Sequence, residues 1–174
     1  MSTQKTLENK VAFIQGGSRG IGAAIAVRLA KEGAAVALTY VSSAAGALDV
    51  VREIEAAGGR AIAIQADSRD EQAIRGAISH TLDTFGRLDI LVNNAGVLAV
   101  APIDEFSIED LDRTLDVNVR SVVIASQEAA RRMSEGGAHH HHRQHQRRAY
   151  AVRRWFGLCA EQGCSGRVHQ GPGA

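Results

Sequence analysis

A glycine-rich segment at residues 16–22 (GGSRGIG) is the first part of the sequence whose residue types could do chemistry. Glycine lets a backbone turn tightly and approach a pyrophosphate closely. The segment lies between a short apolar run at 10–15 and a stretch with helical spacing at 20–32. The N-terminus of that helix would offer free N–H groups and a positive dipole end to phosphates. In this context we favour a dinucleotide-binding turn over a purely structural strand-to-helix turn.

The end of the second apolar run, residues 34–40, indicates which dinucleotide is bound. Domains that bind NAD place an acid there to hold the ribose 2′-hydroxyl. Here Tyr40 is followed by a valine and two serines, so no carboxylate would repel a 2′-phosphate. Arg19 could pair with that phosphate, and Ser42 or Ser43 could add a hydroxyl. We therefore predict NADP(H), the alternative being that Arg19 is a solvated surface arginine.

Apolar runs alternate with helical repeats along the chain. Strands are predicted at 10–15, 34–40, 60–66 and 88–94, and helices at 20–32, 44–57, 70–84 and from Ser107 to about Met133. Ser107 can cap the last helix, with Asp110 as the acidic partner of a capping box. This alternation predicts an α/β fold with a parallel sheet, and right-handed crossovers favour the doubly wound Rossmann arrangement.

Composition narrows the function classes. A chain of 174 residues with 45% hydrophobic and 22% charged residues is expected to form one globular domain. Its net charge of +1 predicts no general attraction to nucleic acid or to an anionic membrane. No apolar run is long enough to span a bilayer, and the first ten residues lack a signal core, so we expect a cytoplasmic protein. Cys159 and Cys164 are expected to be free thiols.

Three motifs together resemble the short-chain dehydrogenase/reductase family: GGSRGIG at 16–22, DILVNNAG at 89–96 and DVNV at 116–119. The similarity extends over residues 8–136, with Gln15 at a position where the family usually has threonine. The resemblance implies an NADP-dependent dehydrogenase or reductase. Such an enzyme moves a hydride between the nicotinamide and the carbonyl carbon of a small-molecule substrate. It also implies a homo-oligomeric protein.

The resemblance further implies roles for individual residues. Cofactor contacts would come from Gly16, Ser18, Arg19, Gly20, Ile21 and Gly22 along the pyrophosphate and adenosine, Tyr40 and Ser42 after the second strand, Asp67 and Ser68 at the adenine, and Asn94, Ala95 and Gly96 beside the cofactor. The alternative for the NNAG segment is a buried amide network with a structural role. Asn118 matches the family's active-site asparagine, which holds a water in a proton relay, although a mid-helix asparagine could also lack a role. No metal ligands are expected.

The family's proton chemistry needs a serine, a tyrosine, and a lysine four residues after the tyrosine, whose charge lowers the tyrosine pKa. This chain has only Tyr40 and Tyr150, and Arg154 stands four residues after Tyr150 in a segment unlike the family's site. We therefore predict that the chain lacks the Tyr-x-x-x-Lys pair and is inactive. We also expect a sheet truncated after about four strands, with the fourth at an open edge, and an incomplete oligomer interface.

The sequence changes character after residue 137. We assign 1–137 to the NADP-binding Rossmann domain and 138–174 to a disordered C-terminal segment outside the family pattern, with six arginines and six histidines against a single acid. Its consecutive histidines at 139–142 could bind metal, which leaves a histidine-rich metal-binding protein as one alternative function. A catalytically inactive NADP-binding module is another. We hypothesise that this segment is the gene read in the wrong frame, because a shifted reading can encode YAPSK.

Overall fold

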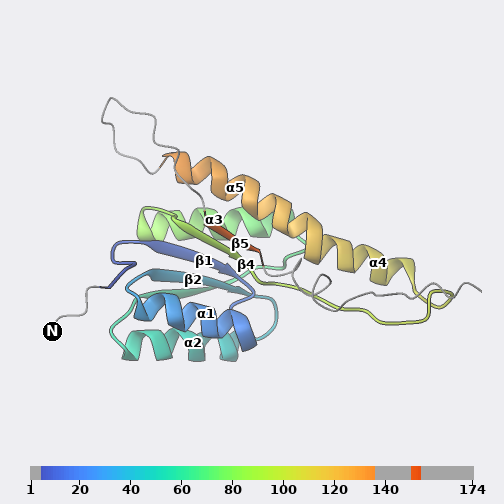
Figure 1. The fold of residues 1–174 in the computed structure, drawn as a ribbon, viewed down its shortest axis with the longest axis horizontal. Helices are drawn as coiled ribbons and strands as arrows, with labels where there is room; N and C mark the ends of the chain where they lie inside the picture. The colour runs from blue at the N-terminus through green and yellow to red at the C-terminus, as the bar shows by residue number, and fades with distance from the viewer. Residues whose placement is uncertain (1–4, 136–149, 154–174) are drawn as a thin grey trace, which may run out of the picture.

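The computed structural model describes residues 5–135 and 150–153, which form a parallel sheet with helices on both faces (Figure 1). The strands are β1 (Val11–Gln15), β2 (Ala35–Tyr40), β3 (Ala61–Gln65), β4 (Ile90–Asn93) and β5 (Tyr150–Arg153), in the order β3-β2-β1-β4-β5. The helices are α1 (Gly20–Lys31), α2 (Ala44–Ala56), α3 (Glu71–Phe85), α4 (Ile108–Leu115), the π-helix η1 (Asp116–Arg120) and α5 (Ser121–Glu135). The predicted doubly wound Rossmann fold is confirmed.

Strand β1 lies at the centre of the sheet and is buried along its whole length. Ala12 and Ile14 face the core under α1 and α2, whereas Phe13 faces the core under α3 and α5. A strand covered on both faces needs apolar residues at every position, not at alternate ones. This explains why the apolar run at the N-terminus shows no period of two.

Helices α4 and α5 form one long helical path through the π-turn η1 (Figure 1). Ser107 begins it as predicted, since its Oγ accepts a hydrogen bond from the Asp110 N–H at 3.0 Å. The Asp110 carboxylate pairs with Arg113 at 2.7 Å. The path ends at Glu135, close to the predicted end near Met133.

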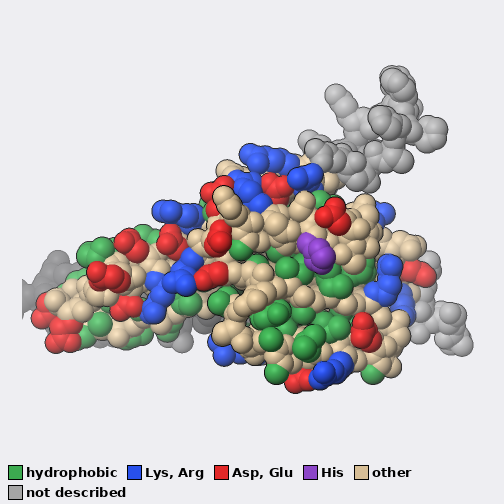
Figure 2. All heavy atoms as spheres, turned by 180° about the vertical axis from the view of Figure 1, so that it is seen from behind, with side chains coloured by type: hydrophobic (Ala, Val, Ile, Leu, Met, Phe, Trp, Pro, Cys, Tyr) green, Lys and Arg blue, Asp and Glu red, His purple; other side chains and the backbone are tan. Residues whose placement is uncertain are grey.

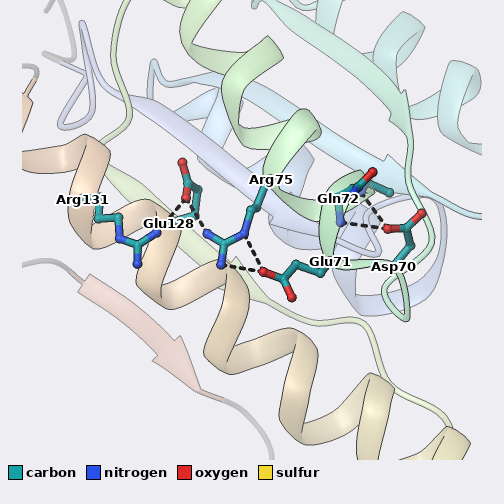
Figure 3. A network of polar contacts seen from close by, with 7 residues as sticks. Asp70, Glu71, Gln72, Arg75, Glu128 and Arg131 are labelled. Carbon is teal, nitrogen blue, oxygen red and sulfur yellow. Dashed lines mark hydrogen bonds and ion pairs between the residues drawn. The ribbon is translucent and has the colours of Figure 1, made fainter.

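Charged side chains hold α5 against α3 (Figure 3). Arg75 on α3 pairs with Glu71 on the same helix and with Glu128 on α5, at 2.8 Å and 2.7 Å. Glu128 also pairs with Arg132 at 2.9 Å and with Arg131 at 3.6 Å. Glu128 is only 6% exposed, so three arginines compensate the burial of its charge.

The expectation that the fourth strand would lie at an open edge is wrong. Strand β5 pairs with β4 in parallel, with Ile90 opposite Tyr150 and Val92 opposite Val152. The unpaired N–H and C=O groups along β4 form a template for another strand, and tyrosine and valine favour extended backbone. This strand comes from the segment that we expected to be disordered. The rest of that segment, with the histidines at 139–142, lies outside the described residues.

In the part of the chain that the structure describes, no helix has both the length and the hydrophobicity needed to cross a membrane.

Candidate cofactor site

A cavity of about 510 Å³ opens where β1, β2, β3 and β4 end. Ten of the residues predicted to bind the cofactor line it: Gly16, Ser18, Arg19, Tyr40, Ser42, Asp67, Ser68, Asn94, Ala95 and Gly96. Segments far apart in the sequence meet there because the carboxyl ends of parallel strands lie at one edge of the sheet. Gly20, Ile21, Gly22 and Asn118 do not line this cavity.

The glycine-rich turn is packed too tightly for side chains. A Cβ on Gly22 would overlap the carbonyl oxygen of Gly16 and Nδ2 of Asn94. Gly16 has a φ of +74°, and a Cβ there would lie 3.0 Å from Cα of Ala95. The Gly16 N–H donates to Oγ1 of Thr39 at 3.0 Å, and Nδ2 of Asn94 donates to the Gly16 carbonyl at 2.7 Å. The turn is therefore held between β2 and the NNAG segment.

Helix α1 begins beside this turn with its first N–H groups available. Arg19 occupies the N-cap position in an extended conformation and makes no side-chain capping hydrogen bond. The first turn of α1 carries no acidic residue. Gly20, with a φ of +56°, and the half-exposed Ile21 open the helix. An uncapped helix start next to a cavity suits a phosphate group.

Positive charge predominates among the residues that line the cavity. These residues include three arginines, Arg19, Arg69 and Arg113, and one carboxylate, Asp67. Arg69 pairs with Asp67, and Arg113 pairs with Asp110. Among the described residues, Arg19 has no ion-pair partner. Its guanidinium is thus available to an anion.

The carboxylate of Asp67 is held by Arg69, two residues further along the chain. The Arg69 backbone N–H donates to Oδ1 at 2.9 Å, and Nη2 donates to Oδ2 at 2.7 Å. The hydrogen bond from the Arg69 side chain holds the pKa of Asp67 below its ordinary value of 3.8, although partial burial opposes this. Asp67 is therefore a hydrogen-bond acceptor at neutral pH.

Asn118 lies in the π-turn η1 and binds the loop that follows β4. Its Oδ1 accepts from the Val97 N–H at 2.9 Å, and its Nδ2 donates to the Val97 carbonyl at 2.8 Å. The neighbouring Val117 lines the cavity. Asn118 therefore has a structural partner, and its role in a proton relay stays a prediction.

Known proteins resemble this chain over most of its length. The family model for short chain dehydrogenase matches residues 10–140. The chain belongs to the short-chain dehydrogenase family. An uncharacterized oxidoreductase of Methylorubrum extorquens is 54% identical over 121 residues, which cover 70% of this chain and 49% of that protein.

Two solved structures resemble the chain closely. A short-chain dehydrogenase/reductase from Serratia marcescens is 58% identical, with a TM-score of 0.72 over 73% of this chain and 52% of that one. A short chain dehydrogenase from Burkholderia cenocepacia, solved in complex with NADP, is 57% identical with a TM-score of 0.72 and the same coverage. The chain spans about half the length of the curated relatives it matches.

Both asparagine side chains of the NNAG segment make hydrogen bonds within the protein. Nδ2 of Asn93 donates to Oγ of Ser126 at 3.4 Å, and Asn94 binds the glycine turn. Beside Asn93 in the sheet, Gln15 is only 2% exposed, and within the described part of the chain neither polar atom of its amide has a hydrogen-bond partner. Oδ1 of Asn93 also lacks one. The family's usual threonine at position 15 is shorter, and the longer glutamine amide finds no partner here.

Sequence reasoning missed several residues that line the cavity: Thr39, Ala66, Arg69, Val97, Arg113 and Val117. Thr39, which binds the glycine turn, precedes Tyr40, so its position next to a predicted site residue was a usable signal. Arg113 carried no signal, because it comes from a helix outside the glycine-rich motif. Among the described residues, no group of three or more His, Cys, Asp or Glu side chains is placed to hold a metal ion.

Proposed function

We propose that this protein is related to NADP(H)-dependent oxidoreductases that interconvert carbonyl compounds and alcohols by hydride transfer, and that the 174-residue chain keeps their binding of NADP(H). The observation that carries the choice of NADP(H) is the Arg19 guanidinium at the cavity, which has no ion-pair partner among the described residues, beside a β2 end without a carboxylate. Tyr40, Ser42 and Ser43 line the same cavity. An arginine and hydroxyl groups suit a 2′-phosphate, whereas NAD-binding sites place an acid there.

The glycine turn fits the pyrophosphate of the same cofactor. A Cβ at Gly22 would fill the space that lets the Gly16 backbone and Asn94 approach each other. With Gly16 held by Thr39 and Asn94, the start of α1 can offer N–H groups to phosphate oxygens. When bound, the nicotinamide would supply or accept the hydride, and the residues described here would hold and orient the dinucleotide.

We infer that the 174-residue chain binds NADPH without turning over a substrate. A reductase of this family needs a tyrosine and a lysine four residues later to move the proton. The tyrosines of the chain are Tyr40, which lines the cavity, and Tyr150, which is followed by Arg154 at the corresponding spacing. We therefore expect this chain to bind the dinucleotide without catalysing a reaction.

The test is a titration of the purified chain with NADPH and NADH, followed by the fluorescence of the bound nicotinamide. We expect NADPH to bind at least about ten-fold more tightly, because one charge-assisted contact contributes this much. Equal binding would refute the choice of NADP(H), and binding of neither dinucleotide would refute the proposed function. Incubation with NADPH and a panel of ketones and aldehydes should leave NADPH absorbance unchanged.

A further inference from the structure

Arg69 lines the cofactor cavity, yet it belongs to none of the motifs that identify the family. It lies between β3 and α3, two residues after Asp67. Both side chains border the same cavity as Arg19 and the residues that follow β2. The following inference rests on the proposed function, since it concerns how the purine end of the dinucleotide is recognised.

The contacts between Arg69 and Asp67 fix the carboxylate from one side. Nη2 donates to Oδ2 at 2.7 Å, and Nε lies 3.2 Å from Oδ2 and 3.3 Å from Oδ1. The Arg69 backbone N–H adds a hydrogen bond to Oδ1 at 2.9 Å. A planar guanidinium that bonds both oxygens leaves a carboxylate little freedom to rotate.

An ionised carboxylate can accept about four hydrogen bonds and donate none. Because Asp67 itself borders the cavity, its remaining acceptor positions are available to a ligand there. An acceptor held in one direction selects a ligand that presents an N–H group, and it repels a ligand that presents a carbonyl oxygen. Adenine carries an amino group at its 6-position, whereas hypoxanthine carries an oxygen at that position.

We propose that Arg69 is a positioning residue that orients the Asp67 carboxylate to accept the 6-amino group of the cofactor's adenine. Arg69 thereby sets a preference for a 6-amino purine over a 6-oxo purine. The Arg69 guanidinium also lines the cavity together with Arg19 and Arg113, so its charge alone adds to the attraction for phosphates. Charge and orientation must therefore be separated in the test.

The experiment titrates the full chain with NADPH and with its hypoxanthine counterpart, and compares the ratio of the two dissociation constants. Three variants are used. Arg69→Leu removes charge and orientation, and Arg69→Lys keeps the charge but loses the two-point contact. Arg52→Leu removes an exposed arginine that pairs with Asp49 on α2 and does not line the cavity.

In the unchanged chain and in Arg52→Leu, we expect NADPH to bind about ten-fold or more tightly than the hypoxanthine dinucleotide. Arg69→Leu and Arg69→Lys should both bring this ratio to within about three-fold of unity, because an acceptor without a fixed direction discriminates poorly. Circular dichroism should show all variants folded.

If the ratio stays high in both Arg69 variants, Arg69 does not position Asp67 and the inference is wrong, although the proposed function stands. A chain that binds NADPH but shows no preference before mutation overturns the inference in the same way. Failure to bind either dinucleotide overturns the inference and the proposed function together.

Discussion

Gly22 shows how one missing Cβ shapes the cofactor site. Exchange for alanine would push a methyl group into the Gly16 carbonyl and Asn94 Nδ2 and break the hydrogen bond between them. We expect Gly22→Ala to lower the free energy of unfolding by about 1–3 kcal/mol and to abolish measurable NADPH binding. Chemical denaturation and a cofactor titration measure these effects.

The matched control is Gly76→Ala in α3, where a Cβ would meet nothing within 4 Å. Alanine at that helical position should raise stability by roughly 0.5–1 kcal/mol and leave NADPH binding unchanged. If Gly22→Ala behaved like Gly76→Ala, the tight approach at the turn would not matter for binding.

The charge of Arg19 is expected to decide which dinucleotide binds more tightly. Because its guanidinium has no ion pair among the described residues, Arg19→Leu should remove a contact to the cofactor without breaking one inside the protein. We expect NADPH to bind roughly 10–100-fold more weakly, and NADH affinity to change by less than about three-fold. Parallel titrations of both dinucleotides decide this, and an equal loss for both would assign Arg19 to the pyrophosphate instead.

The site residues that could be predicted from the sequence are those that belong to a short contiguous motif. A glycine-rich turn between a strand and a helix is typical of dinucleotide-binding sites, so residues 16–22 stand out without a structure. Arg69 does not, because its role depends on the direction of its side chain toward Asp67 and on the cavity beside both. Gln15 is a departure from the family that the sequence shows, but its unpaired amide becomes visible only in the packed core.

At the scale of elements, Glu128 adds an ion pair to the apolar contact of α5 with α3 (Figure 3). The Arg132 guanidinium, helped by Arg75, holds the pKa of Glu128 below its ordinary value of 4.5, although burial opposes the shift. A lowered pKa in the folded state means that ionised Glu128 stabilises the fold above that ordinary value. This stabilisation is lost as the pH falls through the lower, folded-state pKa.

We therefore expect Glu128→Gln to lower the free energy of unfolding at neutral pH by about 1–2 kcal/mol, less than for a fully buried pair because the arginines remain partly in solvent. The difference from the unchanged chain should shrink as the pH falls below 4.5, since Glu128 is then becoming neutral in both states. Thermal unfolding at a series of pH values measures this difference in stability. A difference that stays constant with pH would show that the carboxylate charge is unimportant.

The strands and helices before Ser107 were predictable, because each strand is a short apolar run, each helix has helical spacing of apolar residues, and glycine or polar residues separate them. The π-turn η1 was not, since residues 116–120 read as ordinary helix. Asn118 in this turn bonds to both backbone groups of Val97, a contact between segments distant in sequence. Strand β5 escaped detection for a similar reason: four residues carry little periodicity, and their pairing depends on the edge that β4 presents.

For the whole molecule, the exposed apolar side chains are unevenly distributed. Of the eleven large hydrophobic residues exposed in the described part of the chain, eight lie from Leu98 to Val123, in the loop before α4 and along the helical path after it. Figure 2 shows hydrophobic side chains among acidic ones at the projecting end of the molecule. Val100 and Ile103 are 85% and 93% exposed. Surfaces of this kind associate with one another in water.

We expect the chain to self-associate with increasing concentration, and the double variant Val100→Lys/Ile103→Lys to reduce this. Light scattering at several concentrations provides the measurement. Leu48→Lys serves as the control, because Leu48 is an exposed apolar residue on α2, away from this region. If both variants reduced association equally, added charge rather than the apolar surface would be the cause.

The order of strands also bears on how the chain folds as it leaves the ribosome. Strand β1 pairs with β2 on one side, Val11 opposite Ala35, and with β4 on the other, Ala12 opposite Ile90. The half-sheet of β1, β2 and β3 can form early from near neighbours, but the second edge of β1 must wait until α3 and β4 have been synthesised. During that interval β1, which is buried along its whole length in the folded protein, has a free edge, so slow translation between β3 and β4 would favour misassembly.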